Sequence, residues 1–175
     1  MLKHRFLVFI AIVAAAAGTS FAQKSTTLAV VQAFYDFDAK NSQTFGRAAI
    51  DARKKWFSSE LYQLFLNEIK REKEYLKKNP TDKPHFGDGL PFRPLDETCH
   101  LGRIRYKHAI SYGTVTVKGD AANVDVYFKY PKGCNIPDIL CALNMEKEKG
   151  RWVISDIRFF PGDTSLVDDL KRREY

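Results

Sequence analysis

The spacing of hydrophobic residues changes once along this chain, near Cys99. Before that point apolar residues recur every three positions, as in Leu28, Val31 and Phe34, which is the spacing of an amphipathic helix. After it they alternate with polar residues, as they do in a half-buried strand. This single change predicts an α+β domain, in which the helices come first and an antiparallel sheet follows.

Three helices are expected before the change. Ser25–Thr27 resembles a helix start, Ser58 or Ser59 caps the longest helix, and the residue before Pro80 avoids helical backbone. Residues 80–94 carry four prolines and two glycines, which predicts an ordered loop or a short edge element. The expected helices run from 25–27 to about 41, from 48 to 57, and from 58 or 59 to 79.

Four strands are expected after it, joined as two hairpins in series. Turn residues at 118–120 and 148–150 separate them, and Ser165 with Asp168 forms a capping box that opens a short terminal helix. We therefore predict N-terminal helices packed on a curved antiparallel four-stranded meander, followed by a short C-terminal helix. The expected strands are 103–117, 122–128, 139–145 and 152–160.

The first 22 residues have the composition of a secretory signal peptide. Lys3 and Arg5 precede an uncharged apolar run, and Ser20 and Ala22 place small residues where a signal peptidase cleaves. Cleavage after Ala22 leaves one domain, 23–175, in the periplasm or secreted, and lowers the net charge from +7 to +5. No later segment approaches the roughly 20 apolar residues of a membrane span.

Export permits a disulfide between two of the three cysteines, which are Cys99, Cys134 and Cys141. Cys141 alternates with apolar residues of an expected strand, whereas the other two lie in connections flanked by proline or glycine. This favours a Cys99–Cys134 bridge with Cys141 as a buried thiol. A Cys134–Cys141 bridge stays open, because sequence alone does not fix connectivity.

Two stretches carry a resemblance to a known fold: Val30–Tyr35 in the first helix and Gly150–Ile157 near the end. With the paired hairpins, they resemble the cone-shaped fold of nuclear transport factor 2-like, ketosteroid-isomerase-like and cystatin-like domains. More narrowly, residues 25–172 resemble a family of small exported bacterial proteins of unknown function, which also carry an Asp-bearing stretch like residues 89–96. The resemblance implies an open cone between helix and sheet, and it leaves a homodimer open.

Enzymes with this fold place Asp, Tyr or His inside the cone. The corresponding candidates are Tyr106, His108 and Tyr112, which share a face of the expected strand 103–117, with Asp36 or Asp38 from the first helix. This face could serve a small-molecule isomerase or dehydratase. A packed aromatic stripe is the alternative interpretation.

Two other features indicate binding. Arg103, Arg105 and Lys107 occupy the opposite face of that strand, and Lys129 joins them from the neighbouring strand. This ladder could bind an acidic protein, or it could be a solvated face. Phe86 and Phe92, in the proline-rich loop, either present apolar anchors to a partner or plug the cone.

No cofactor or metal is expected, because His85, His100 and His108 lack the spacing of a metal site. Outside the inner membrane, nucleic acid is not an expected partner. The sequence favours an exported non-catalytic binding module for a protein or a small ligand, with an immunity protein against a periplasm-acting toxin and an isomerase as alternatives. An enzyme needs an open polar cone, whereas a binding module can have its cone filled by Phe34, Phe65 and Trp152.

Overall fold

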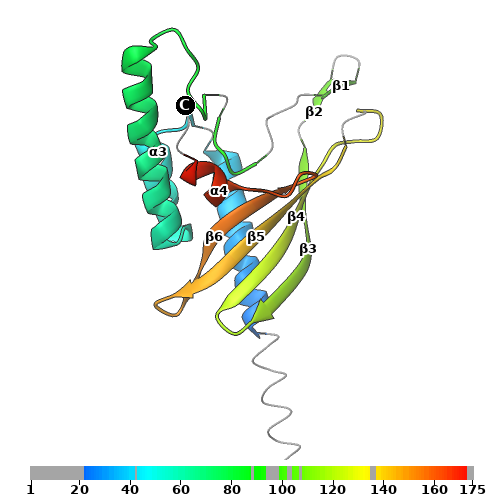
Figure 1. Ribbon diagram of the computed structural model, residues 1–175. Coiled ribbons are helices and arrows are strands. Elements are labelled where there is room, and N and C mark those ends of the chain that lie inside the picture. Colours follow the sequence, from blue (N-terminus) through cyan, green and yellow to red (C-terminus); the bar gives the residue numbers. More distant parts are fainter. Residues whose placement is uncertain are drawn as a thin grey trace, which may run out of the picture.

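The computed structural model describes residues 22–41, 43–87, 89–93, 99–101, 104–106, 108–134 and 137–172 (Figure 1). The order of elements confirms the predicted α+β class: helices, then an antiparallel sheet, then a short helix. Of the expected signal peptide only Ala22 lies within the described residues, so export remains a prediction. Within those residues, no helix combines the length and the apolar character needed to cross a bilayer.

The first helix is described from 22 to 40 and does not begin at Ser25–Thr27. Thr27 lies inside it, since its hydroxyl donates to the Gln23 carbonyl, four residues back, at 2.7 Å. Ser58 caps the long helix as predicted, because its Oγ accepts from the Leu61 amide at 3.1 Å. The later helical elements are α2 (Arg47–Arg53), the 3-10 helix η1 (Lys54–Trp56) and α3 (Ser59–Lys78).

The main sheet has five strands rather than four, in the order β3-β4-β5-β6-β7. The fifth strand was missed because two residues are too few to show an alternating pattern. It forms where the chain turns back after Phe160 and Thr164 pairs with Phe159. The bounds are β3 (Ala109–Lys118), β4 (Ala121–Lys129), β5 (Ile139–Glu148), β6 (Arg151–Phe160) and β7 (Thr164–Ser165), followed by α4 (Leu166–Lys171).

The predicted strand 103–117 does not exist as one element. Its first part, β2 (Ile104–Tyr106), pairs with β1 (Cys99–Leu101) in a separate two-stranded sheet, and β3 begins only at Ala109. A bulge between Tyr112 and Val115 then interrupts the pairing of β3 with β4. Gly113 is needed there, because a Cβ would lie 2.7 Å from the Tyr127 ring.

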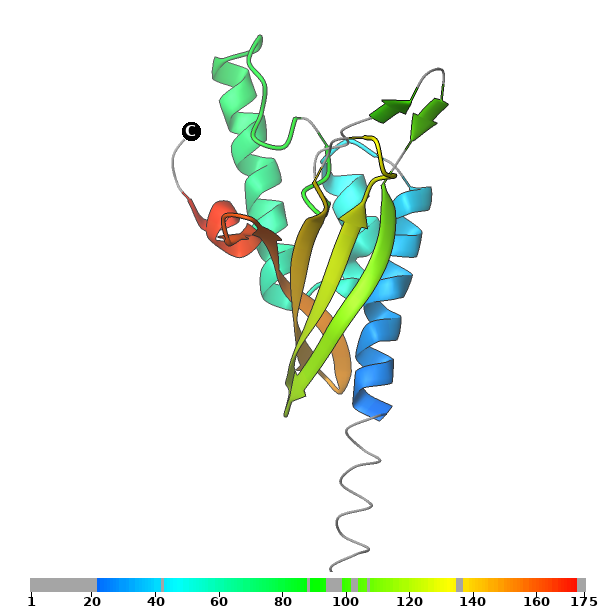
Figure 2. The ribbon, with the colours of Figure 1, turned by 90° about the vertical axis from the view of Figure 1, so that its right-hand side faces the viewer.

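The first helix crosses one face of the sheet, and α3 stands beyond β6 (Figures 1 and 2). Strand β4 shows the alternation that this packing requires: Val124, Val126 and Phe128 are fully buried, whereas the residues between them are partly exposed. Phe34 and Phe65 bring aromatic rings from the first helix and α3 into the same core.

Candidate functional site

The structure does not assemble the predicted catalytic face. Tyr106 belongs to β2 of the small sheet, whereas Tyr112 belongs to β3, and His108 precedes that strand. Tyr112 is half-buried, and its pKa is raised to about 12, first by burial and then by the negative charge of Asp36. Asp36 itself is exposed. These residues do not share one strand face.

The predicted cationic ladder also lacks a continuous pair of strands. Lys129 lies at the end of β4, opposite Ala109, and its Nζ is 5.3 Å from the centroid of the Tyr127 ring. Arg105 belongs to β2, in the other sheet. Arg103, Lys107 and the side chain of Arg105 lie outside the described residues, so their role stays a prediction.

Aromatic side chains fill the space between the helices and the sheet. Phe92 is fully buried, with its ring centroid 5.6 Å from Phe34 and 5.5 Å from Phe65. Phe92 is therefore part of the core and not an exposed anchor; that it plugs a cone stays a prediction. Phe34 and Phe65 are also fully buried, and Trp152 is 7% exposed. All three are residues that the sequence placed in the interior of a binding module, and the structure buries them.

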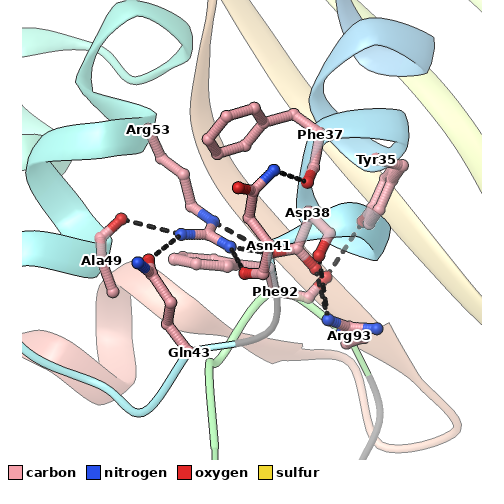
Figure 3. Close-up of polar contacts among 9 residues, drawn as sticks. All are labelled: Tyr35, Phe37, Asp38, Asn41, Gln43, Ala49, Arg53, Phe92 and Arg93. Atoms are coloured by element: carbon pink, nitrogen blue, oxygen red, sulfur yellow. Dashed lines mark hydrogen bonds and ion pairs between the residues drawn. The ribbon is translucent and has the colours of Figure 1, made fainter.

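A buried ionic network holds the Phe92 segment in place (Figure 3). Both the Arg53 and Asp38 side chains are buried, and the Arg53 Nε donates to Asp38 Oδ1 at 2.8 Å. Arg93 reaches the other carboxylate oxygen, with Nη2 3.0 Å from Oδ2. Asp38 therefore pairs with two guanidinium groups, which gives it a structural role in this network. The other acceptors around Arg53 are Gln43 Oε1 and the carbonyls of Asn41 and Ala49.

A surface crevice remains beside this network, between the 84–93 loop, α4 and the end of β6. It encloses about 300 Å³. Its polar rim includes His85, Arg93, Thr164 and Asp169. Pockets of this kind, apolar with a few polar groups, bind ligands or partner side chains. Its apolar lining is Phe86, Leu90, Pro91, Phe159 and Leu166.

His85 connects three segments at this crevice. Its Nδ1 lies 3.0 Å from Glu68 Oε1 on α3, and its Nε2 lies 3.0 Å from Asp169 Oδ2 on α4. Only the doubly protonated imidazolium can donate to both carboxylates at once. The ring also stacks on Phe86, with 4.1 Å between centroids, so Phe86 is half-buried rather than an exposed anchor.

Acidic residues of α3 support the loop from below. Glu68 is fully buried and pairs with both His85 and Arg71. Glu72 accepts a hydrogen bond from the Phe86 amide at 2.7 Å, and burial, opposed by this bond, raises the pKa of its carboxyl. Arg71 also donates to carbonyls at the end of α4, including that of Leu170. This arrangement holds α3, the loop and α4 in one relative position.

A sequence signal for this cluster does exist. Leu61, Phe65, Glu68 and Glu72 recur at intervals of three or four residues, and all four are buried on α3. Two acids that continue an apolar stripe indicate buried carboxylates with partners. Neither Glu68 nor Glu72 is among the candidate residues drawn from the sequence above.

The cysteines are resolved in part. Cys141 is a free, buried thiol, and burial raises its pKa to about 12. The Cys134–Cys141 alternative is therefore wrong for this structure. The side chain of Cys99 lies outside the described residues, so the Cys99–Cys134 bridge stays a prediction. In the described part of the chain, no group of three or more His, Cys, Asp and Glu side chains could hold a metal ion.

Comparison with known proteins adds no functional assignment: no family model, no curated protein and no solved structure matches the chain.

Proposed function

We propose that this protein is an exported, non-catalytic binding module with a nuclear transport factor 2-like cone, and that its crevice binds an acidic protein partner. The observation that carries this proposal is the filled interior. Phe34, Phe65 and Phe92 are each fully buried, whereas enzymes with the fold that the sequence resembles keep an open polar cavity between helix and sheet. A domain whose interior is packed in this way acts through its surface.

The crevice offers two kinds of interaction to a partner. Its apolar part is large enough for one or two hydrophobic side chains, which commonly anchor a protein interface. A second hollow of about 290 Å³ shares His85 and Asp169 with it and adds Glu68, Arg71, Lys83 and Arg172. Arg71 and Arg172 already pair with Glu68 and Asp169, so the charge that favours an acidic partner is that of the whole chain, +7 before and +5 after the proposed cleavage.

The test is capture from a periplasmic extract by the immobilised protein, followed by mass spectrometry. Leu90→Asp places a charge in the apolar part of the crevice, and Thr116→Asp adds the same charge on exposed β3, away from it. We expect one acidic protein to bind the wild type and Thr116→Asp but not Leu90→Asp. The purified partner should show the same order in calorimetry.

Retention that is equal on all three proteins would overturn the crevice as the binding surface. If no acidic protein is captured that high salt releases, the proposal that this protein is a binding module is overturned. Circular dichroism of each variant establishes that a loss of binding is not a loss of folding.

An immunity protein is one specific form of this proposal, in which the captured acidic partner is a toxin. The isomerase alternative receives less support, because Tyr106 and Tyr112 stand in two different sheets.

A further inference from the structure

A larger hollow is lined by residues of the β5–β6 turn and of the start of the first helix. Both segments lie at the end of the sheet away from α4 (Figures 1 and 2). It encloses about 650 Å³, within the size range of pockets that hold small organic ligands. Gln23 and Thr26 of the first helix line one side of it. The other side is lined by Lys55, Trp56, Lys147, Arg151 and Trp152.

The charges in this pocket are unbalanced. Lys55, Lys147 and Arg151 contribute three positive charges, and none of the described residues that line the pocket is Asp or Glu. Lys147 has one acidic neighbour, Asp120, at 3.4 Å, but Asp120 is 82% exposed. Within the described part of the chain, neither Lys55 nor Arg151 forms an ion pair. Three cations that share one hollow repel each other unless an anion joins them.

Two indole rings keep these cations at the pocket. The Lys55 Nζ lies 4.1 Å from the Trp56 ring centroid, and the Lys147 Nζ lies 4.9 Å from that of Trp152. Both tryptophans are 7% exposed, so their rings are fixed by the core. These contacts favour lysine positions beside the buried rings, which reduces the entropy lost on binding.

We propose that this pocket binds a small organic phosphate, in which a phosphate monoester lies among Lys55, Lys147 and Arg151. A phosphate monoester carries a charge of about −1.5 to −2 at neutral pH, and arginine can bind it through two parallel hydrogen bonds. The hollow is far larger than one phosphate group. The organic part of the ligand occupies the remainder, against Val30 and the edges of the indole rings.

The proposed export would strengthen this site. Ala22 and Gln23 both line the pocket, so cleavage after Ala22 places the new α-ammonium group of Gln23 at its edge. That group has an ordinary pKa of about 8, and the positive end of a helix dipole accompanies it. Only this additional charge rests on the proposed function, because the three side-chain cations are present with or without cleavage.

The two tryptophans provide the measurement. They are the only tryptophans in the chain, and both line the pocket, so fluorescence excited selectively in tryptophan reports on this site. We expect glucose 6-phosphate to cause a saturable change in the fluorescence of the protein purified from whole cells. Glucose should cause no change. Inorganic phosphate should bind more weakly than glucose 6-phosphate, by about tenfold at least, because it leaves the apolar lining unused.

Charge reversal identifies the residues responsible. Lys55→Glu combined with Arg151→Glu should weaken glucose 6-phosphate binding by about tenfold or more. Lys73→Glu combined with Lys77→Glu changes the net charge equally on the exposed surface of α3 and should leave binding unchanged. The proposal is overturned if glucose binds as well as its phosphate, if inorganic phosphate binds as tightly as the ester, or if both double variants behave alike.

Intact mass separates this proposal from the proposed export. A protein that begins at Gln23 has been cleaved as predicted, and one that begins at Met1 has not. If an uncleaved chain responds to glucose 6-phosphate, the pocket is supported and the export proposal fails. If a cleaved chain does not respond, export is supported and the pocket proposal fails.

Discussion

Arg53 is the clearest case of one residue that determines local structure. All of its N–H groups have acceptors, and the rings of Phe37 and Phe92 lie 5.3 and 5.6 Å from its guanidinium carbon. A buried cation so fully bonded is stable only while its anion stays in place. Arg53 and Asp38 therefore act as one unit that fixes the end of the first helix against α2.

We predict that Arg53→Met lowers the free energy of unfolding by about 3 kcal/mol, because it leaves the buried Asp38 charge with only Arg93 as a partner. Urea denaturation followed by circular dichroism measures the change. Arg47→Met removes an ion pair with Asp51 that is exposed, and it should leave stability nearly unchanged. An equal loss of unfolding free energy in the two variants would show that the buried Arg53–Asp38 pair stabilises the fold no more than an exposed pair does.

Cys141 allows a second prediction at this scale. With its pKa raised to about 12, about one molecule in 10,000 carries the reactive thiolate at pH 8. Iodoacetamide should therefore leave the native thiol unmodified for hours and label it within minutes in denaturant. Mass spectrometry of the labelled peptide measures both rates.

The same labelling tests the predicted bridge. In denaturant without reductant, Cys141 alone should be labelled if Cys99 and Cys134 are paired. Labelling of Cys99 instead would contradict both that bridge and the free thiol at Cys141.

At the scale of elements, the 84–93 loop has a fixed position because His85 links it to two helices. His85→Phe keeps a ring that can stack on Phe86 but removes the bonds to Glu68 and Asp169. We expect amide hydrogens of the loop and of α4 to exchange about tenfold faster in this variant. This corresponds to a decrease of about 1.4 kcal/mol in the free energy of local opening.

Hydrogen exchange measured by mass spectrometry resolves these segments. Lys73→Ala, on the exposed face of α3, is the matched control and should leave both rates unchanged. Exchange that accelerates equally in β4 would show general destabilisation rather than a released loop.

The elements themselves were largely predictable, because periodicity and turn residues are local signals. Ser58 as a cap and the turn at Gly119 were read correctly from the sequence. The division of residues 103–117 between two sheets was not predictable. The alternation of apolar and polar residues looks the same whether a strand continues in one sheet or passes into another. Only tertiary packing decides that β2 pairs with β1 and that β3 begins at Ala109.

At the scale of the molecule, both candidate sites combine segments that are distant in sequence. Glu68, His85 and Asp169 meet at one crevice, and Trp56 and Trp152 meet at the other pocket. A local sequence pattern does not reveal which distant segments meet in the folded protein. The sequence did indicate the 84–93 loop as a binding or plugging element, and the structure buries Phe92 in the core.

The pH dependence of overall stability provides the last prediction, and it depends on Glu72. Burial raises the pKa of this carboxyl above its ordinary value of 4.5, so the folded protein binds a proton that the unfolded chain has released. Between the unfolded and the folded pKa values, the free energy of unfolding contributed by Glu72 therefore falls as the pH rises.

Glu72→Gln cannot titrate, and its side-chain oxygen can still accept from the Phe86 amide. The variant should gain stability relative to the wild type as the pH rises through this window, as urea denaturation at a series of pH values will measure. Glu74→Gln, on the exposed side of α3, should follow the wild type throughout. If Glu74→Gln and Glu72→Gln show the same slope, the buried carboxylate under the loop is not the group that titrates.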